Sequence, residues 1–274
     1  MALAFVKRNP TPGELERFRL ILSTYQDGSG MLALKDGRTI PGWRDFERAL
    51  ATAFGGQAQE SKAIFDVLLP DQERPGISFG LSCKMRATLD RIDKDNRVTI
   101  ELSNSAGKFW QHLKTYGIDQ SNYRVRPAEV GVAIVELVEQ WHRAVSIEQG
   151  GRVDLAGSSY LVLSYNGHGS YQLHQFPREL PDPSAITWHF PVTTRKGVTR
   201  AANHLRGEDA AGTIFEWYGE SGGQLKYYPL ATSAIWKSER FQLEPFPLEQ
   251  DRAVLIRKAE TYFPNLWAHA NSLE

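Results

Sequence analysis

The chain has 274 residues, of which 41% are hydrophobic and 23% charged, proportions that are ordinary for a globular protein. Its 32 basic and 32 acidic residues give no net charge, which argues against a histone-like nucleic-acid binder that relies on overall charge. A local basic groove remains compatible with this balance, because acidic residues on other surfaces can compensate it.

The single cysteine, Cys83, excludes an intrachain disulfide and a cysteine-based zinc cage, and it fits the reducing cytoplasm. Residues 1–10 are too short and too polar for the apolar part of a secretion signal. No segment approaches the ~18 consecutive apolar residues that a membrane helix needs. We therefore expect a cytoplasmic protein that does not enter the membrane.

Two helices are predicted near the N-terminus. Thr11-Pro12-Gly13-Glu14 has the pattern of a capping box with proline at the first helical position. A second helix follows Pro41-Gly42 and ends at Gly55-Gly56. Phe46 belongs to its apolar stripe. Glu47, beside it, is either near the edge of that buried face or a plain exposed helix glutamate.

Two apolar runs, 64–70 and 77–84, are bounded by turn residues and predict strands that are buried on both faces. Each contains one ionisable side chain that such a strand should avoid, Asp66 in the first and Lys84 in the second. Burying either charge alone costs roughly several kcal/mol. Neighbouring strands that bring the acid and the lysine together, with a divalent metal between them, would offset this cost.

Further elements are predicted along the rest of the chain, and strands predominate after residue 152. They are a turn at 86–96, a strand at 97–102, helices at 105–116 and 127–149, a hairpin of strands 160–165 and 171–176, strands at 186–190, 213–218 and 225–228, and a helix at 248–263. Residues 150–158 are the best candidate for a linker. His142, in the longest helix, is interpreted as a structural or surface histidine.

The order of these elements resembles the nucleases with a PD-(D/E)xK core, the fold of most type II restriction endonucleases. In that family an acid lies on one strand and an acid-x-lysine triplet on the next, and Asp66 and Lys84 match the acid and the lysine. Two departures stand out. Phe65 replaces the proline before the first acid, and Ser82 occupies the position of the second acid.

A subset of restriction endonucleases has serine at this position and takes its second carboxylate from a segment further along the chain. Glu101 is therefore our first candidate for the missing acid. Glu47 and Glu60 are alternatives, because the family often has a glutamate on the helix before the acidic strand. The resemblance covers about residues 42–115, and its motif is degenerate.

The resemblance implies a magnesium site. Asp66, Glu101 and the backbone carbonyl of Cys83 would hold Mg2+ through oxygen ligands. The metal would polarise the scissile phosphate and lower the pKa of a bound water. Lys84 would orient or help deprotonate that water and neutralise charge on the phosphate.

The fold expected from the resemblance is α/β (α+β mixed), with a central mixed sheet flanked by helices. Residues 1–150 would contain a helical N-terminal part and the catalytic core, and 151–274 a β-rich DNA-recognition region with a C-terminal helix, unless both form one continuous domain. The densest basic cluster, interleaved with polar residues, supplies the candidate DNA contacts: Arg195, Lys196, Arg200, Asn203, His204 and Arg206.

Three functions are compatible with these residues. The first is a Mg2+-dependent type II site-specific endonuclease of a restriction-modification system, acting on double-stranded DNA as a homodimer, because two-fold symmetry suits palindromic sites. The second is a catalytically inactive DNA-binding module of the same fold, as Ser82 suggests. The third is a glycan hydrolase that uses Asp66 and Glu101, although such sites seldom need a lysine on the neighbouring strand.

Overall fold

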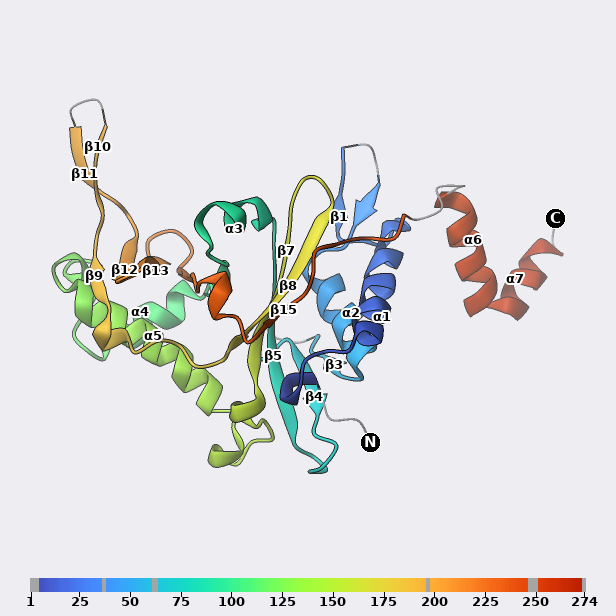
Figure 1. Ribbon diagram of the computed structural model, residues 1–274, viewed down its shortest axis with the longest axis horizontal. Helices are drawn as coiled ribbons and strands as arrows, with labels where there is room; N and C mark the ends of the chain where they lie inside the picture. The colour runs from blue at the N-terminus through green and yellow to red at the C-terminus, as the bar shows by residue number, and fades with distance from the viewer. Residues whose placement is uncertain (1–4, 36–37, 61–63, 196–197, 246–250, 273–274) are drawn as a thin grey trace.

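The computed structural model describes residues 5–35, 38–60, 64–195, 198–245 and 251–272, and within these ranges the chain combines helices with two larger sheets (Figure 1). The helices are α1 (Pro12–Ser23), α2 (Trp43–Phe54), α3 (Leu89–Asp95), α4 (Ala106–Lys114), α5 (Pro127–Arg143), α6 (Asp251–Tyr262) and α7 (Pro264–Asn271). The expected mixture of helices and strands is thus confirmed. None of the helices in these ranges is both long and apolar enough to cross a membrane.

The larger sheet is mixed and has the strand order β15-β8-β7-β5-β4-β3, with β16 also paired to β8. Its strands are β3 (Gln57–Ala58), β4 (Val67–Pro70), β5 (Ser78–Arg86), β7 (Ser159–Tyr165), β8 (Ser170–Pro177), β15 (Trp236–Lys237) and β16 (Phe241–Gln242). β5 runs antiparallel to β4 and parallel to β7. The connection from β5 to β7 contains α3, α4 and α5.

The second sheet is antiparallel and has the order β6-β14-β13-β12-β9. Its strands are β6 (Ile100–Ser103), β9 (Thr187–His189), β12 (Leu205–Asp209), β13 (Gly212–Tyr218) and β14 (Gln224–Tyr227). Two hairpins form separate two-stranded ribbons: β1 (Leu32–Ala33) with β2 (Thr39–Ile40), and β10 (Val192–Arg195) with β11 (Val198–Ala201). The β10–β11 ribbon projects from one end of the molecule in Figure 1.

Two large hydrophobic cores hold these layers together, and a smaller cluster contains Phe65, Val153 and Leu155. On one face of the larger sheet, Phe46 and Leu50 of α2 pack with Leu81 of β5 in a core that also includes α1. The other face contributes Tyr160 and Val162 of β7 to a second core, which is shared with α4, α5 and the antiparallel sheet. α5 therefore packs between the two sheets and joins them.

Most predicted helix starts are confirmed, because their signals are local. Thr11 forms the complete capping box with Glu14 at the start of α1. The prediction of a turn at 86–96 is wrong, since α3 forms there and buries Leu89 and Ile92. The last predicted helix, 248–263, corresponds to α6, and the structure adds a further helix, α7, which begins at Pro264 after a break at Phe263. The start predicted for the 248–263 helix lies outside the described residues.

Strands from both sides of the candidate linker 150–158 meet in both sheets. β5 pairs with β7 in the larger sheet, and β6 pairs with β14 in the antiparallel one. The linker itself contains the short helical turn Leu155–Gly157 and the backbone contacts that lead into β7. Both sheets therefore depend on chain segments from each of the two regions named above.

Candidate active site

Asp66 and Lys84 lie side by side at the junction of β4 and β5. Asp66 directly precedes β4, and the pairing of Val67 with Leu81 places it opposite Ser82. Its Oδ2 atom accepts hydrogen bonds from Lys84 Nζ at 2.8 Å and from the backbone N–H of Cys83 at 2.7 Å. The side chains of Asp66 and Lys84 are 27% and 20% exposed, so the pair is reachable from solvent.

The alternation of β5 decides which side chains share this site. Leu81 and Cys83 face the core beneath α1 and α2, so Ser82 and Lys84 lie on the opposite face. Burial and the nearby Asp66 carboxylate raise the pKa of the Cys83 thiol well above its usual value. Cys83 therefore contributes backbone atoms to the site, while its side chain belongs to the core.

Glu47 on α2 is the second acid of this region. Its residue surface is only 3% exposed, so it is not a plain surface glutamate. Burial and the negative charge of Asp66 raise the pKa of Glu47 to about 7, while Arg44 and Lys84 act in the opposite direction. Glu47 thus lies within the electrostatic field of the Asp66–Lys84 pair.

The other two candidate acids have different partners. Glu101 is on β6 in the antiparallel sheet and forms an ion pair with Arg86, which ends β5 two residues beyond Lys84. Glu60 is 58% exposed and bonds to Arg44 at 3.1 Å and to Arg48 at 2.9 Å. The structure therefore groups Glu47 with Asp66 and Lys84, and it holds Glu101 and Glu60 to arginines.

The donor atoms at this position are those that Mg2+ prefers. Carboxylate and backbone carbonyl oxygens are hard ligands, and Mg2+ commonly uses one or two carboxylates and keeps several waters. Among the residues that the structure describes, no three His, Cys, Asp or Glu side chains converge closely enough to form a complete metal cage. Asp66 and Glu47 are the two carboxylates of this region that could hold part of such a site, with water and substrate as the further ligands.

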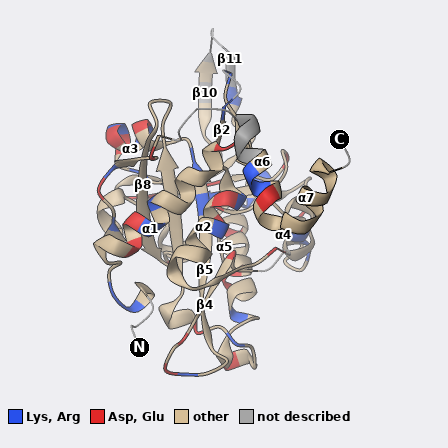
Figure 2. Ribbon diagram, turned by 90° about the vertical axis from the view of Figure 1, so that its right-hand side faces the viewer, with Lys and Arg blue, Asp and Glu red and all other residues tan. Residues whose placement is uncertain are grey.

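The basic cluster is divided between the β10–β11 ribbon and its base. The ladder pairs the backbone of Thr193 with that of Arg200 and the backbone of Arg195 with that of Val198, which places both arginines within the ribbon. Arg200 is exposed, and Figure 2 shows basic residues on this ribbon. Lys196, at its tip, lies outside the described residues.

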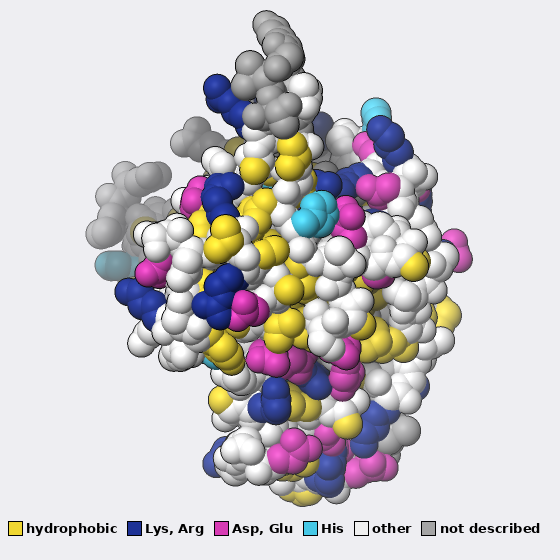
Figure 3. Space-filling model, turned by 90° about the vertical axis from the view of Figure 1, so that its left-hand side faces the viewer, with side chains coloured by type: hydrophobic (Ala, Val, Ile, Leu, Met, Phe, Trp, Pro, Cys, Tyr) yellow, Lys and Arg dark blue, Asp and Glu magenta, His cyan; other side chains and the backbone are white. Residues whose placement is uncertain are grey.

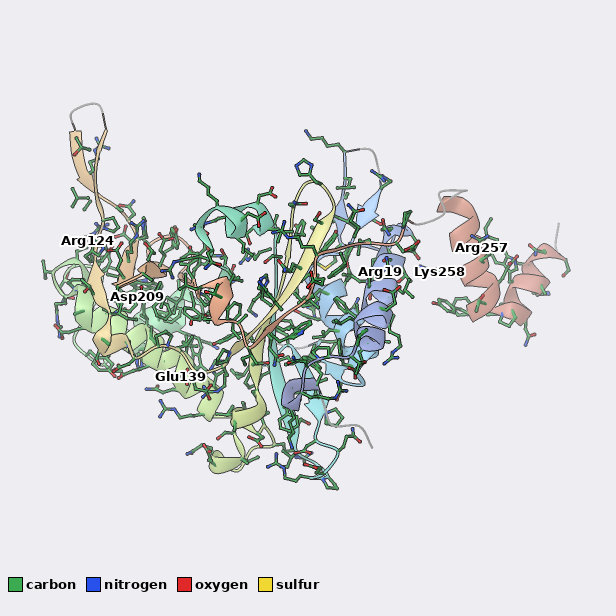
Figure 4. The ribbon with its side chains drawn as sticks, viewed as in Figure 1. Arg19, Arg124, Glu139, Asp209, Arg257 and Lys258 are labelled. Atoms are coloured by element: carbon green, nitrogen blue, oxygen red, sulfur yellow. The ribbon has the colours of Figure 1, made fainter. Side chains whose placement is uncertain are left out.

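The remaining members of the cluster are bound within the protein. Arg124, labelled below the ribbon in Figure 4, donates a hydrogen bond to Asn203 Oδ1 at 3.3 Å. Arg206 donates to a Glu216 carboxylate oxygen at 3.1 Å, and His204 Nε2 lies 3.5 Å from the same oxygen. These three residues therefore support the base of the ribbon.

Sequence reasoning missed a row of alternating charges across the antiparallel sheet. Neighbouring strands place Glu101, Lys226, Glu216 and Arg206 in one continuous cross-strand row. The row begins at Arg86, on the same face of β5 as Lys84. Only strand register brings these residues together, so no local pattern could have revealed the row. Figure 3 shows acidic and basic side chains interspersed on one outer face of the protein.

A comparison of this chain with family models, curated proteins and solved structures finds no match. The functional information that remains is the geometry of Asp66, Lys84 and Glu47 and of the elements that position them. The acid and lysine were expected from the sequence to meet across two strands, and they do so at hydrogen-bonding distance.

Proposed function

We propose that this protein is a Mg2+-dependent, site-specific endonuclease that hydrolyses phosphodiester bonds in double-stranded DNA, with a PD-(D/E)xK-like core. The observation that carries the proposal is the Asp66–Lys84 pair at the junction of β4 and β5, with a buried glutamate of α2, Glu47, within the electrostatic influence of both charges. A mixed sheet with helices on both faces also agrees with the restriction-endonuclease-like fold that the resemblance implies.

In this proposal Asp66 and Glu47 supply the two carboxylates of the metal site, and the Cys83 carbonyl supplies a third oxygen. Glu47 is preferred to Glu101, because Glu101 already neutralises Arg86 on the other sheet. The hydrogen bonds from the Cys83 N–H and from Lys84 Nζ both fall on Oδ2 of the Asp66 carboxylate. This arrangement fixes the carboxylate plane before any metal or substrate binds.

The chain's own residues have distinct tasks in the proposed reaction. When bound, Mg2+ supplies Lewis acidity toward the scissile phosphate and its attacking water. Lys84 places a positive charge where the phosphate gains negative charge, and it can hold the water that attacks. Asp66 keeps the Lys84 ammonium in place through their 2.8 Å hydrogen bond.

The proposed DNA contacts lie on the β10–β11 ribbon. A two-stranded ribbon fits the major groove, and arginine can bond to guanine edges or to phosphates. The ribbon contains Arg195 and Arg200, and the side chain of Arg200 is exposed. We further propose a cytoplasmic homodimer, since two-fold symmetry would place two such sites on the two strands of a palindromic sequence.

Substitution of the central pair tests the proposal. Asp66→Asn and Lys84→Ala should each slow Mg2+-dependent cleavage of plasmid and phage DNA on the order of 10²-fold or more, because the first removes a carboxylate of the metal site and the second removes the positive charge at the reacting phosphate. Binding of the same DNA without metal should persist. Glu47→Gln should be similarly slow, whereas the exposed Glu60→Gln should cut like the wild type. Unimpaired cleavage by both Asp66→Asn and Lys84→Ala would refute the assignment.

A DNA-binding module without catalysis is the second candidate. It is favoured by Ser82, which is buried opposite Asp66 where the resemblance expects an acid. Purified protein mixed with DNA and either Mg2+ or Mn2+ separates the two candidates. Stable binding with no cleavage across a broad set of phage DNAs would favour the module, and discrete fragments would favour the endonuclease.

A further inference from the structure

Phe65, the residue directly before Asp66, packs closely against β5. Its residue surface is 2% exposed, and its ring lies over Gly80. A Cβ at Gly80 would come within 2.3 Å of that ring, so the position needs glycine. The backbone N–H of Asp66 donates to the carbonyl of Leu81 at 2.9 Å, which extends this contact to the catalytic acid.

His142 of α5 stacks on the same phenylalanine ring. The two ring centroids are 5.3 Å apart with an interplanar angle of 21°, and His142 also meets Tyr160 edge-on at 6.0 Å. The residue is 5% exposed. Burial, helped by the positive charges of Arg178 and Lys84, lowers the pKa of His142 to about 3. The His142 imidazole is therefore uncharged at physiological pH, and it stacks on Phe65 as a neutral aromatic ring.

We propose that His142 is a positioning residue, which holds Phe65 against Gly80 and thereby keeps the Asp66 carboxylate aligned with Lys84. The inference rests on the proposed nuclease function and adds α5 to β4, β5 and α2, the elements that build the proposed site. Phe65 and Asp66 share a peptide bond, so a shift of the ring moves the acid. Misplacement of a reacting group by about 1 Å can cost a rate on the order of 10²-fold.

His174 provides a matched control. It is also a buried histidine, 1% exposed, and it stacks on Phe176 with centroids 6.2 Å apart and an angle of 14°. It lies on β8, separated from β4 by β7 and β5 in the sheet. Replacing either histidine with alanine removes a buried ring, so a merely structural role predicts similar effects for the two variants.

The kinetic test compares three variants with the wild type. His142→Ala should lower kcat for DNA cleavage on the order of 10²-fold with KM little changed, since the alignment of the acid is lost but the DNA contacts remain. His142→Phe restores a stacking ring and should recover most of the rate. His174→Ala should leave kcat within about twofold of the wild type. Equal losses in the two alanine variants, or no rescue by phenylalanine, would overturn the inference.

The single cysteine gives a readout that does not depend on cleavage. The N–H of Cys83 donates to Asp66, and its thiol is buried. Loss of the stack should loosen this strand and raise the rate at which a thiol reagent modifies Cys83 at least fivefold in His142→Ala, but not in His174→Ala. An unchanged rate in both would overturn the positioning role, whereas a wild type that never cuts DNA would overturn the proposed function alone.

Discussion

At the scale of single residues, two charges in apolar strands were the most informative feature of this chain. The sequence predicts both inside strands buried on both faces, but Asp66 directly precedes β4 and both side chains are partly exposed. The structure nevertheless pairs them at 2.8 Å. The sequence alone does not decide whether Glu47 is buried. It follows Phe46, which belongs to the apolar stripe of its helix, so its side chain could lie near the edge of the buried face or be exposed. Only the packing of α2 on the larger sheet shows that it is buried.

A buried histidine predicts the acid sensitivity of the fold. Burial, together with the charges of Lys237 and Arg240, lowers the pKa of His174 to about 4, against about 6.5 in an unfolded chain. Between these values the unfolded chain binds a proton that the native protein does not. The stability contributed by His174 is complete above pH 6.5 and is lost as the pH falls toward 4.

Replacing this imidazole should flatten the dependence of stability on pH. Between pH 7 and pH 4.5 the free energy of unfolding of His174→Phe should fall by about 2 kcal/mol less than that of the wild type. Urea unfolding at the two pH values measures the difference. If both proteins lose the same free energy, His174 is not a buried neutral group in the native state.

At the scale of elements, the position of α5 depends on Gly131 in its second turn. Glycine inside a helix costs about 1 kcal/mol relative to alanine, so its presence in α5 has a packing cause. A Cβ on Gly131 would lie 2.1 Å from the Trp188 ring of β9. The missing side chain allows α5 to approach the antiparallel sheet.

Gly131→Ala should therefore destabilise the protein despite the higher helix propensity of alanine. The overpacked contact with Trp188 should lower the free energy of unfolding by about 1 to 3 kcal/mol. Gly107→Ala in α4 is the control, because a Cβ there meets nothing within 4 Å, and it should gain up to about 1 kcal/mol. Denaturant melts that rank the two variants in the opposite order would contradict this packing.

At the scale of the whole molecule, the neutral charge balance limits how the proposed endonuclease would hold DNA. With 32 basic and 32 acidic residues, overall attraction to a polyanion is absent, so affinity must come from local contacts. The ribbon is a suitable place, since residues 183–207 contain no Asp or Glu. Binding should therefore show a salt dependence set by a small number of phosphate contacts.

Arg200 tests this expectation. Arg200→Ala should weaken DNA binding and reduce the slope of log affinity against log salt by about 0.9, because one phosphate contact is lost. Fluorescence anisotropy without divalent metal, at several salt concentrations, measures both quantities. Arg17→Ala, an exposed arginine on α1, is the control and should change neither. An unchanged slope for Arg200→Ala would remove the ribbon from the DNA interface.

The sequence by itself determined the start of α1, the strand pair with its acid and lysine, and the hairpin of β7 and β8. These features follow from capping, apolar periodicity and turn chemistry, which act over a few residues. α3 escaped prediction because its sequence is polar, and it forms a helix by burying Leu89 and Ile92.

Only the tertiary structure decided which acid joins Asp66, where Glu101 lies, and that His142 stacks behind the site. The sequence alone cannot choose the second acid of the site among Glu47, Glu60 and Glu101. Their different partners arise from the register of β6 with β14 and the packing of α2 on the larger sheet. Such contacts join residues far apart in the chain, and their choice depends on the burial energy of whole elements rather than on local sequence.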